Sequence, residues 1–205
     1  MRLCLTQKPA REPRALPERG VTHAFTIIEL LVVISVIVVL AGLVLGTSGY
    51  VQKKGARSRA EAEIAALSAA LESYKADNGV YPESTGLDAK KDFYPNGIDK
   101  PKYDAASQTL YAALTGDDDR NRAKGANETG KSYFSFKPNM LSPTDQNATV
   151  TGVRDPFSNT YGYSTANQSD PAKGYNPTFD LWSTSGNKEL TESEPTYLAR
   201  WIKNW

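Results

Sequence analysis

Apolar residues dominate one long stretch near the start of the chain. The run from Ile27 to Gly46 is 20 residues long and holds one charged residue, Glu29. As an α-helix rising about 1.5 Å per residue, it would be about 30 Å long, which is the thickness of the hydrocarbon core of a bilayer. The pattern therefore predicts a membrane-spanning helix. A secretory signal usually has a shorter apolar region, so conventional cleavage at the small residues 46–49 is the weaker alternative.

The sequence after this run is more polar but keeps the spacing of a helix. Apolar side chains recur at every third or fourth position, which places them on one helix face: Ala60, Ile64, Leu67, Leu71 and Tyr74. Charged residues are expected to face away from it: Glu61, Glu63, Glu72 and Lys75. Asn78 and Gly79 form a C-cap, and Pro82 prevents continuation. We expect one helix of about 50 residues, Phe25 to Asp77, with softening near the glycines at 42, 46 and 49.

Shorter elements are expected in the rest of the chain. The spacing predicts a helix over Asp104–Thr115, with three residues facing inward: Leu110, Tyr111 and Leu114. The charge run from Gly116 to Gly125 is interpreted as a solvated loop. A cation site is the alternative there, although the run lacks the glycine and glutamate spacing of an EF-hand loop.

Alternating runs after Lys131, separated by Pro and Gly, predict short antiparallel strands. These runs are SYFSFK, ATVTGV, TYGYST and TFDLWST. Their aromatic residues are expected in the core: Phe134, Phe136, Tyr161, Tyr163, Phe179 and Trp182. The fold class is therefore α+β, in which a long N-terminal helix packs by its C-terminal half on a small antiparallel sheet domain.

Charge and composition exclude several classes of function. The formal net charge of +1 over 205 residues gives no general attraction to nucleic acid. The first 24 residues carry a net charge of +3 and hold the only cysteine, Cys4, and the only histidine, His23. If this segment is removed, the chain has no Cys or His nucleophile, no zinc ligands of the usual kind and no disulfide. The sequence also has no phosphate-binding loop or nucleophile elbow, so we expect no enzymatic activity.

Glu29 is the unusual residue of the apolar run. A charged side chain deep in lipid is costly unless it has a partner, so an acid in a membrane-spanning segment suggests a function. Glu29 lies only two residues inside the run, however, and its carboxylate could simply reach the membrane interface. The orientation of the helix is also open, because the basic head is balanced by bases after the run at Lys53, Lys54, Arg57 and Arg59.

The segment AFTIIELLVVISVIVVLAGL, which begins at Ala24, resembles the N-terminal signature of type IV pilins and type II secretion pseudopilins. In that family a basic leader ends in a small residue, followed by Phe-Thr, two apolar residues, Glu and a long apolar helix. The resemblance implies cleavage by a prepilin peptidase between Ala24 and Phe25, followed by N-methylation of Phe25. Ala24 replaces the usual glycine and the leader is long, which implies slower processing at most.

The resemblance also implies a partner for Glu29. Cleavage would leave a cationic amine on Phe25, and in the family the glutamate pairs with the N-terminal amine of a neighbouring subunit during filament assembly. Opposite charges attract more strongly in an apolar bundle than in water, and an unpaired charge is heavily penalised there. Glu29 would then set the axial register of the subunits.

Later segments are similar to the major pseudopilin of type II secretion. The stretch LESYKADNGVYPESTGL resembles that family's helix end, a Tyr-Lys-x-Asn/Asp-Gly-x-Tyr-Pro run. The stretches RDPFSNTYGYS, FDLWSTSGNKE and IKNW resemble its C-terminal segments, with Phe157 in place of a tryptophan. The resemblance does not cover the middle of the chain.

The resemblance places a calcium site in the C-terminal loop, where the family uses backbone carbonyls and aspartates. Matched residue by residue, the candidate ligands are the carbonyls of Leu181 and Thr184 and the side chains of Asn187, Glu192 and Glu194. Calcium prefers about six to eight oxygen ligands. Asn187 replaces an aspartate and Lys188 follows it, so the alternative is a loop held by backbone hydrogen bonds and by packing of Trp182 or Trp201.

The resemblance implies a structural subunit of a type II secretion pseudopilus in the bacterial inner membrane. The implied partners are copies of itself and other pseudopilins, the prepilin peptidase and N-methyltransferase, the inner-membrane assembly platform and the secretion ATPase, with no nucleic acid. No cofactor is required, and a structural calcium ion is the one bound ion that the resemblance suggests. The alternatives are a type IV pilin for adhesion, motility or DNA uptake, although many pilins have a C-terminal disulfide, and a membrane-anchored protein of other function.

The implied domain organisation has four parts. Residues 1–24 are the leader, and residues 25–46 are the transmembrane and filament-core helix. Residues 47–78 are the amphipathic half of that helix. Residues 79–205 form the periplasmic globular domain.

Overall fold

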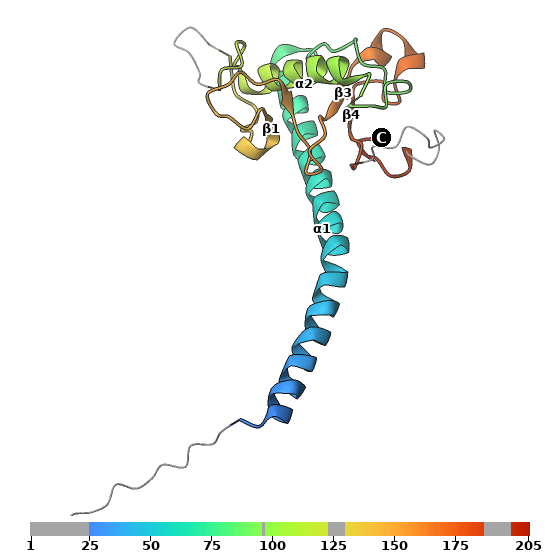
Figure 1. Ribbon diagram of the computed structural model, residues 1–205. Coiled ribbons are helices and arrows are strands. Elements are labelled where there is room, and N and C mark those ends of the chain that lie inside the picture. Colours follow the sequence, from blue (N-terminus) through green and yellow to red (C-terminus); the bar gives the residue numbers. More distant parts are fainter. Residues whose placement is uncertain (1–24, 96, 123–129, 187–197) are drawn as a thin grey trace, which may run out of the picture. The chain divides into compact units, whose positions relative to one another are not determined.

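The structure is a computed structural model that describes residues 25–95, 97–122, 130–186 and 198–205. The chain divides into two compact units, Met1–Thr47 and Ser48–Trp205. The second unit contains α2 and all of the strands (Figure 1).

Helix α1 spans Ile27–Asn78, 52 residues, and confirms the long helix predicted from the sequence. It starts two residues later and ends one residue later than expected. The helix is continuous through the glycines at 42, 46 and 49. It ends at Gly79, which has a φ of 79° and donates its N–H to the Lys75 carbonyl at 2.7 Å. Glycine adopts this left-handed conformation without steric cost, so the predicted C-cap is confirmed.

The predicted apolar stripe of α1 is the helix contribution to the main core. Four of its residues are buried: Ala60, Ile64, Leu67 and Leu71. The fifth, Tyr74, is half-buried, and its ring centroid lies 5.3 Å from that of Tyr133. Glu61 and Glu72 are exposed, as predicted.

Two charged residues of α1 do not face away as predicted. Glu63 is half-buried and accepts a hydrogen bond from the Tyr161 hydroxyl at 2.8 Å. Lys75 is half-buried, with its ammonium 4.5 Å from the centre of the Tyr81 ring. Long polar side chains can cover an apolar surface while their heads find polar or aromatic partners, which explains both placements.

Helix α2 spans Lys100–Thr115 and starts four residues earlier than predicted. Pro101 lies in its first turn, where a missing backbone N–H has no cost. Leu110, Tyr111 and Leu114 are buried, as predicted.

The charge run after α2 is only partly solvated. Asp118 and Asp119 are exposed, in agreement with the solvated-loop interpretation. That interpretation is wrong for Asp117, which is 4% exposed. Residues 123–125 of the run lie outside the described residues.

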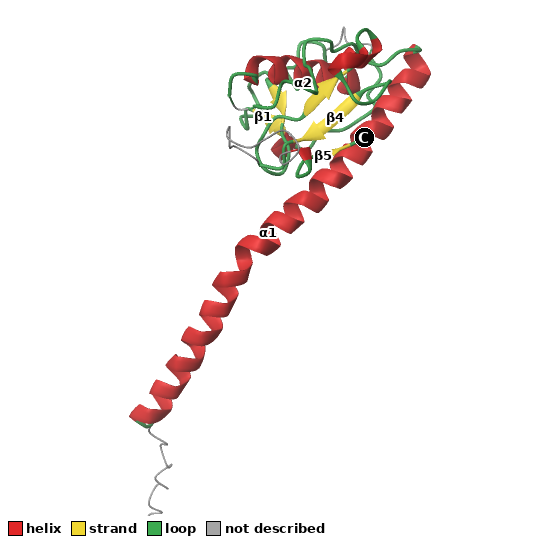
Figure 2. Ribbon diagram, turned by 90° about the vertical axis from the view of Figure 1, so that its right-hand side faces the viewer, coloured by secondary structure: helices red, strands yellow, loops and turns green. Residues whose placement is uncertain are grey.

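The strands form two antiparallel sheets. The first pairs β1 (Leu141–Ser142) with β2 (Gly152–Val153). The second has the order β3-β4-β5, with bounds Gly162–Ser164, Asp180–Ser183 and Ile202–Lys203. In Figure 2 the strands lie between α2 and the C-terminal half of α1, and residues of all three regions contribute to one core.

Three of the four predicted strand runs contain a strand, and the fourth does not. The SYFSFK run has no strand pairing because the N–H groups of Tyr133 and Phe134 both donate to the Leu114 carbonyl, at 2.8 and 3.0 Å. The sequence patterns did not predict β1 or β5. Single 3-10 turns complete the described elements at Pro138–Met140, Ala166–Gln168 and Pro171–Lys173.

The aromatic residues of these runs are core residues, as predicted. Tyr161, Tyr163 and Phe179 are at most 3% exposed and belong to the main core, on which the half-buried Phe134 and Phe136 pack. Trp182 is fully buried in a second core cluster. The described part of the chain is therefore an α+β arrangement of one long apolar N-terminal helix and small antiparallel sheets.

Candidate functional site

The start of α1 is closed by reciprocal hydrogen bonds between Thr26 and Glu29. The backbone N–H of Glu29 donates to the Thr26 hydroxyl oxygen at 3.3 Å, and the backbone N–H of Thr26 donates to Glu29 Oε2 at 3.3 Å. The Thr26 hydroxyl also donates to Glu29 Oε2 at 3.1 Å. This is a capping box, in which two side chains satisfy backbone donors that a helix start leaves unpaired.

Glu29 therefore has a local structural role that the sequence interpretation missed. The signal was present, since Thr-x-x-Glu immediately before an apolar run is the sequence signature of a capping box. Among the ion pairs between described residues, none involves Glu29. Its negative charge lies at the positive end of the helix dipole, which stabilises it.

The structure describes one of the two residues at the expected cleavage site. Phe25 precedes the capping box and its side chain is 78% exposed. Ala24 lies outside the described residues. The expected cut between them stays a prediction.

The large apolar side chains in the N-terminal half of α1 are not covered by other parts of the chain that the structure describes. Every large apolar side chain from Phe25 to Val51 is at least 48% exposed. The helix contains a window of mean hydropathy 3.1 and is long and apolar enough to cross a membrane. Exposed apolar surfaces of this extent mark membrane or protein interaction sites, and by its length and composition this helix could span a membrane.

The structure describes two of the five candidate calcium ligands. The Leu181 carbonyl accepts a hydrogen bond from the Asn204 N–H at 3.2 Å, and the Thr184 hydroxyl accepts one from Asn159 Nδ2 at 3.0 Å. Asn187, Glu192 and Glu194 lie outside the described residues. Within the described ranges, no group of three or more acidic, His or Cys side chains is arranged to hold a metal. The calcium site therefore stays a prediction.

Tryptophan packing supports the strand that leads into this loop. The Trp182 and Trp201 rings stack with their centroids 5.9 Å apart and an interplanar angle of 4°. The Trp182 indole N–H donates to the Tyr103 hydroxyl at 2.9 Å. Gly162 lies under the Trp182 ring, where a Cβ would be 2.2 Å from the ring atom Cε2. The packing of Trp182 and Trp201, which the alternative to calcium binding requires, is therefore present in the structure.

Asp155 is a buried carboxylate next to the same strand, and the sequence interpretation did not identify it. It is 4% exposed. Its Oδ1 accepts hydrogen bonds from the N–H groups of Phe157 and Asn159 at 2.9 and 2.8 Å, and its Oδ2 accepts one from the Ser183 hydroxyl. Burial raises the pKa of Asp155 to about 6, although these hydrogen bonds act in the opposite direction. Asp155 therefore links the turn before β3 to the end of β4.

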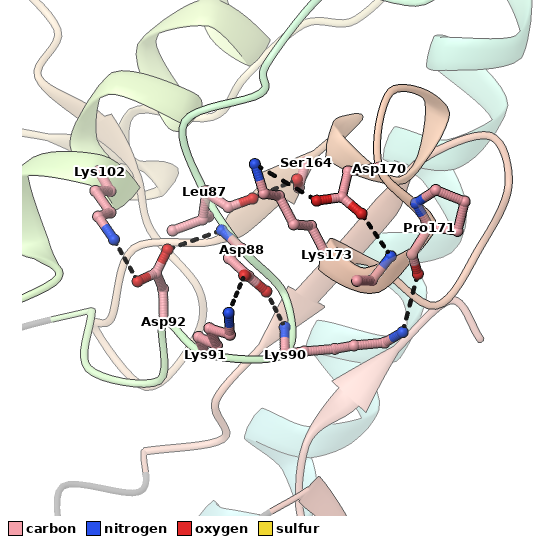
Figure 3. A network of polar contacts seen from close by, with 11 residues as sticks. Leu87, Asp88, Lys90, Lys91, Asp92, Lys102, Ser164, Asp170, Pro171 and Lys173 are labelled. Carbon is pink, nitrogen blue, oxygen red and sulfur yellow. Dashed lines mark hydrogen bonds and ion pairs between the residues drawn. The ribbon is translucent and has the colours of Figure 1, made fainter.

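A network of lysines and aspartates holds the segment after α1 (Figure 3). Asp92 pairs with Lys102 of α2 and accepts the N–H of Asp88 at 2.8 Å. Lys90 donates to the Pro171 carbonyl at 3.1 Å, and its N–H donates to Asp88 Oδ1 at 2.8 Å. The aspartates of this network are paired with neighbouring lysines. The network therefore joins these segments structurally and is not arranged as a cation site.

Comparisons of the chain with family models, with curated proteins and with solved structures found no match. The geometry of the α1 start and the exposure of its apolar half are therefore the observations from which a function is argued.

Proposed function

We propose that the chain is a structural subunit of a type II secretion pseudopilus, made as a precursor and cut between Ala24 and Phe25. The mature helix spans the inner membrane before assembly and packs in the filament core afterwards. The globular unit lies in the periplasm. Polymerisation drives the export of proteins across the outer membrane, and the chain itself performs no catalysis.

The observation that supports this proposal is a carboxylate without an ion-pair partner among the described residues, at the start of a helix whose N-terminal half exposes its apolar side chains all round. Every large apolar residue from Phe25 to Val51 is at least 48% exposed. The described hydrogen bonds of the Glu29 carboxylate are all with Thr26. A simple membrane anchor needs the apolar surface and can use the helix cap, but the cap alone does not require a negative charge, because a neutral amide can also make it. A subunit that moves from lipid into a helical filament uses both.

The charge partner in this proposal is the amine that cleavage creates on Phe25. The capping box holds the Glu29 carboxylate at the helix start, close along the chain to Phe25. The amine of a second subunit can then approach that carboxylate in an apolar filament core, where the attraction is stronger than in water. A subunit out of register would leave a buried charge unpaired, which is strongly unfavourable.

Mass spectrometry of the chain extracted from membranes tests the processing step. The expected N-terminus is N-methylated Phe25. An intact leader, or a start near the small residues 46–49, would remove the basis for the proposal.

Deletion of the gene in the source bacterium tests the role in secretion. Export of secreted proteins across the outer membrane should stop and return on complementation, whereas surface pili should be unaffected. Loss of surface pili with normal export would support a type IV pilin instead.

A further inference from the structure

The loop between β1 and β2 carries a sequence pattern that filament assembly does not use. Its tip reads Asp145-Gln146-Asn147-Ala148-Thr149. Asn-x-Thr, with x other than proline, is the acceptor pattern for N-linked glycans, which are attached to surface loops of exported proteins. Because so short a pattern also arises by chance, its structural context decides whether it can act as an acceptor.

The two residues that define the pattern are accessible. Asn147 and Thr149 are both exposed. Neither the side-chain amide of Asn147 nor the hydroxyl of Thr149 makes a hydrogen bond with any residue that the structure describes. The amide nitrogen is the atom that receives the glycan, and the hydroxyl is the second group of the pattern. Both groups are therefore available to a transferase.

The loop is held by the globular unit on both sides of its tip. The N–H of Thr151 donates to the Ser142 carbonyl at 2.7 Å, next to the paired ends of β1 and β2. Arg122 Nε donates to the Ala148 carbonyl at 3.0 Å. The tip is thus presented from a fixed base, and a transferase can reach it without separating the two strands.

The turn at the tip accounts for Asp145 but not for the acceptor pattern. Asp145 Oδ1 accepts the N–H of Asn147 at 3.0 Å, and the Asp145 carbonyl accepts the N–H of Ala148 at 3.3 Å. Asn147 is not in the left-handed conformation that favours asparagine in turns. The Thr149 hydroxyl takes no part in the turn. Other residues at positions 147 and 149 could therefore form the same turn.

A second Asn-x-Ser pattern in the described part of the chain, at Asn167, lacks this context. Asn167 is half-buried in the 3-10 turn Ala166–Gln168. A Cβ placed on Gly174 would be 2.7 Å from the Asn167 Cβ, so the side chain is packed closely against that backbone. The Ser169 hydroxyl donates to the Ala166 carbonyl at 3.0 Å. Both groups of this pattern are therefore engaged in the fold.

A charge also distinguishes the two patterns. Asp145 lies two residues before Asn147 and is exposed, whereas the corresponding residue before Asn167 is the buried Thr165. An exposed carboxylate beside the acceptor can bind a cationic group of a transferase through a charge-assisted hydrogen bond. Asn147 is therefore the better acceptor of the two. A third pattern, which begins at Asn127, lies outside the described residues.

The modification is a group transfer from a lipid-linked donor. The Asn147 amide nitrogen forms a bond to the anomeric carbon of a glycan that is carried on a membrane lipid diphosphate. The bond from that carbon to the diphosphate oxygen breaks, and the lipid diphosphate leaves with the bonding electron pair. The amide proton passes to a base of the transferase. No oxidant or reductant is consumed.

We propose that Asn147 is the acceptor of an N-linked glycan, with Thr149 as the second recognised residue and Asp145 as an additional contact. The partner is a membrane-bound oligosaccharyltransferase that uses the lipid-linked donor. This inference rests on the part of the proposed function that places the globular unit in the periplasm, and it adds a modification that filament assembly does not require.

Peptide mass spectrometry of the native chain, extracted from membranes of the source bacterium, tests the inference. The peptide that contains Asn147 should carry a glycan mass, and fragment ions should place that mass on the Asn147 amide. The peptide that contains Asn167 should be unmodified. An unmodified Asn147, or a glycan on Asn167 alone, would overturn the inference.

The same digest separates this inference from the proposed function, because it also reports the N-terminus. An unmodified Asn147 on a chain that begins with methylated Phe25 would overturn the glycan inference and support the pilin-type processing. A glycan at Asn147 on a chain with an intact leader would support the glycan inference and overturn the processing step.

Substitutions within the loop separate N-linked attachment from other modifications. Asn147→Gln should remove the glycan, and Thr149→Ala should remove it although the asparagine is retained. The matched control is Thr144→Ala, at another exposed position of the loop, which should leave the glycan in place. Asp145→Asn retains an acceptor for the turn but not the charge, so the glycosylated fraction should fall. Full glycosylation of Thr149→Ala, or a glycan on a threonine hydroxyl, would contradict the proposal.

Discussion

Thr26 and Glu29 satisfy each other's backbone N–H groups at the start of α1, with both donor–acceptor distances at 3.3 Å. The same carboxylate therefore has two separable properties. Its oxygen caps the helix, which a neutral amide can also do. Its negative charge can pair with a cation, which a neutral amide cannot do.

Glu29→Gln should separate these two roles. Glutamine keeps the capping-box hydrogen bond but removes the charge, so the precursor should still be processed while incorporation into filaments is lost. Glu29→Ala should lose both properties. Pull-down of assembled filaments, with processing followed by mass spectrometry, measures the two outcomes.

Thr26→Ala is the matched control for the cap. It removes the hydroxyl that accepts the Glu29 N–H but leaves the charge, and capping substitutions of this kind cost about 1 kcal/mol. Filament incorporation should be largely retained. If Glu29→Gln assembles as well as the unaltered chain, the carboxylate acts only as a cap and the register argument is wrong.

Gly162→Ala should destabilise the globular unit. A Cβ at this position of β3 would be 2.2 Å from the Trp182 ring, and that ring is fully buried against Trp201 and Tyr103. Overpacking of this kind typically costs about 1–3 kcal/mol. Chemical denaturation of the full chain should show a lower free energy of unfolding.

Gly86→Ala is the control for this glycine. A Cβ there has no atom within 4 Å, and its φ is not in the left-handed region. Its unfolding free energy should stay the same or rise slightly, because alanine lowers the entropy of the unfolded chain. Equal stability of the two variants would mean that the Trp182 ring moves aside at little cost.

The helices could be predicted from the sequence because their signals are local. The stripe that includes Leu67 and Leu71 follows helical spacing, and Gly79 supplies the left-handed stop. Both signals act within a few residues along the chain. The end of α2 at Thr115 was predictable for the same reason.

The sheet and Asp155 could not be predicted as well, because they depend on partners far along the chain, and the burial of Asp117 depends on how a nearby loop folds back on α2. The run containing Phe134 alternates like a strand, but its N–H donates to the end of α2 instead. Asp117 occurs in a charge run that reads as solvent-exposed, and it is buried because Tyr111 and Arg122 contribute donors to it. Asp155 is held by Ser183, 28 residues later in the sequence. No local pattern indicates these pairings.

Calcium should raise the thermal midpoint of the full chain if the C-terminal loop binds it. A ligand that binds only the folded state adds about 2.7 kcal/mol at a concentration of 100 times its dissociation constant. Differential scanning fluorimetry with calcium and with a chelator measures the shift, and magnesium, which prefers a smaller octahedral site, should give less. Asn187→Ala should reduce the calcium effect. The same midpoint with calcium and with chelator would exclude Asn187, Glu192 and Glu194 as ligands.

Asp155 should make the globular unit less stable as the pH rises from about 4 to about 6. Burial raises the pKa of Asp155 from 3.8 to about 6, so within this window the folded state holds a proton that the unfolded chain has released. The contribution of Asp155 to stability is therefore greatest at low pH and is lost as the pH passes the folded-state pKa, by about 3 kcal/mol in total and by about 2 kcal/mol between pH 4 and pH 6. Urea unfolding across this range measures the slope.

Asp155→Asn isolates this group from the other acids of the chain. The amide oxygen can still accept the N–H groups of Phe157 and Asn159, and Ser183 can turn to accept from the amide nitrogen. Because asparagine does not titrate, the difference in unfolding free energy between this variant and the unaltered chain should change by about 2 kcal/mol from pH 4 to pH 6. Asp118→Asn, at an exposed position, should not produce that change. A constant difference for Asp155→Asn would mean that Asp155 releases its proton at the same pH in the folded and unfolded chains, and that the Ser183 contact and the backbone donors fully offset its burial.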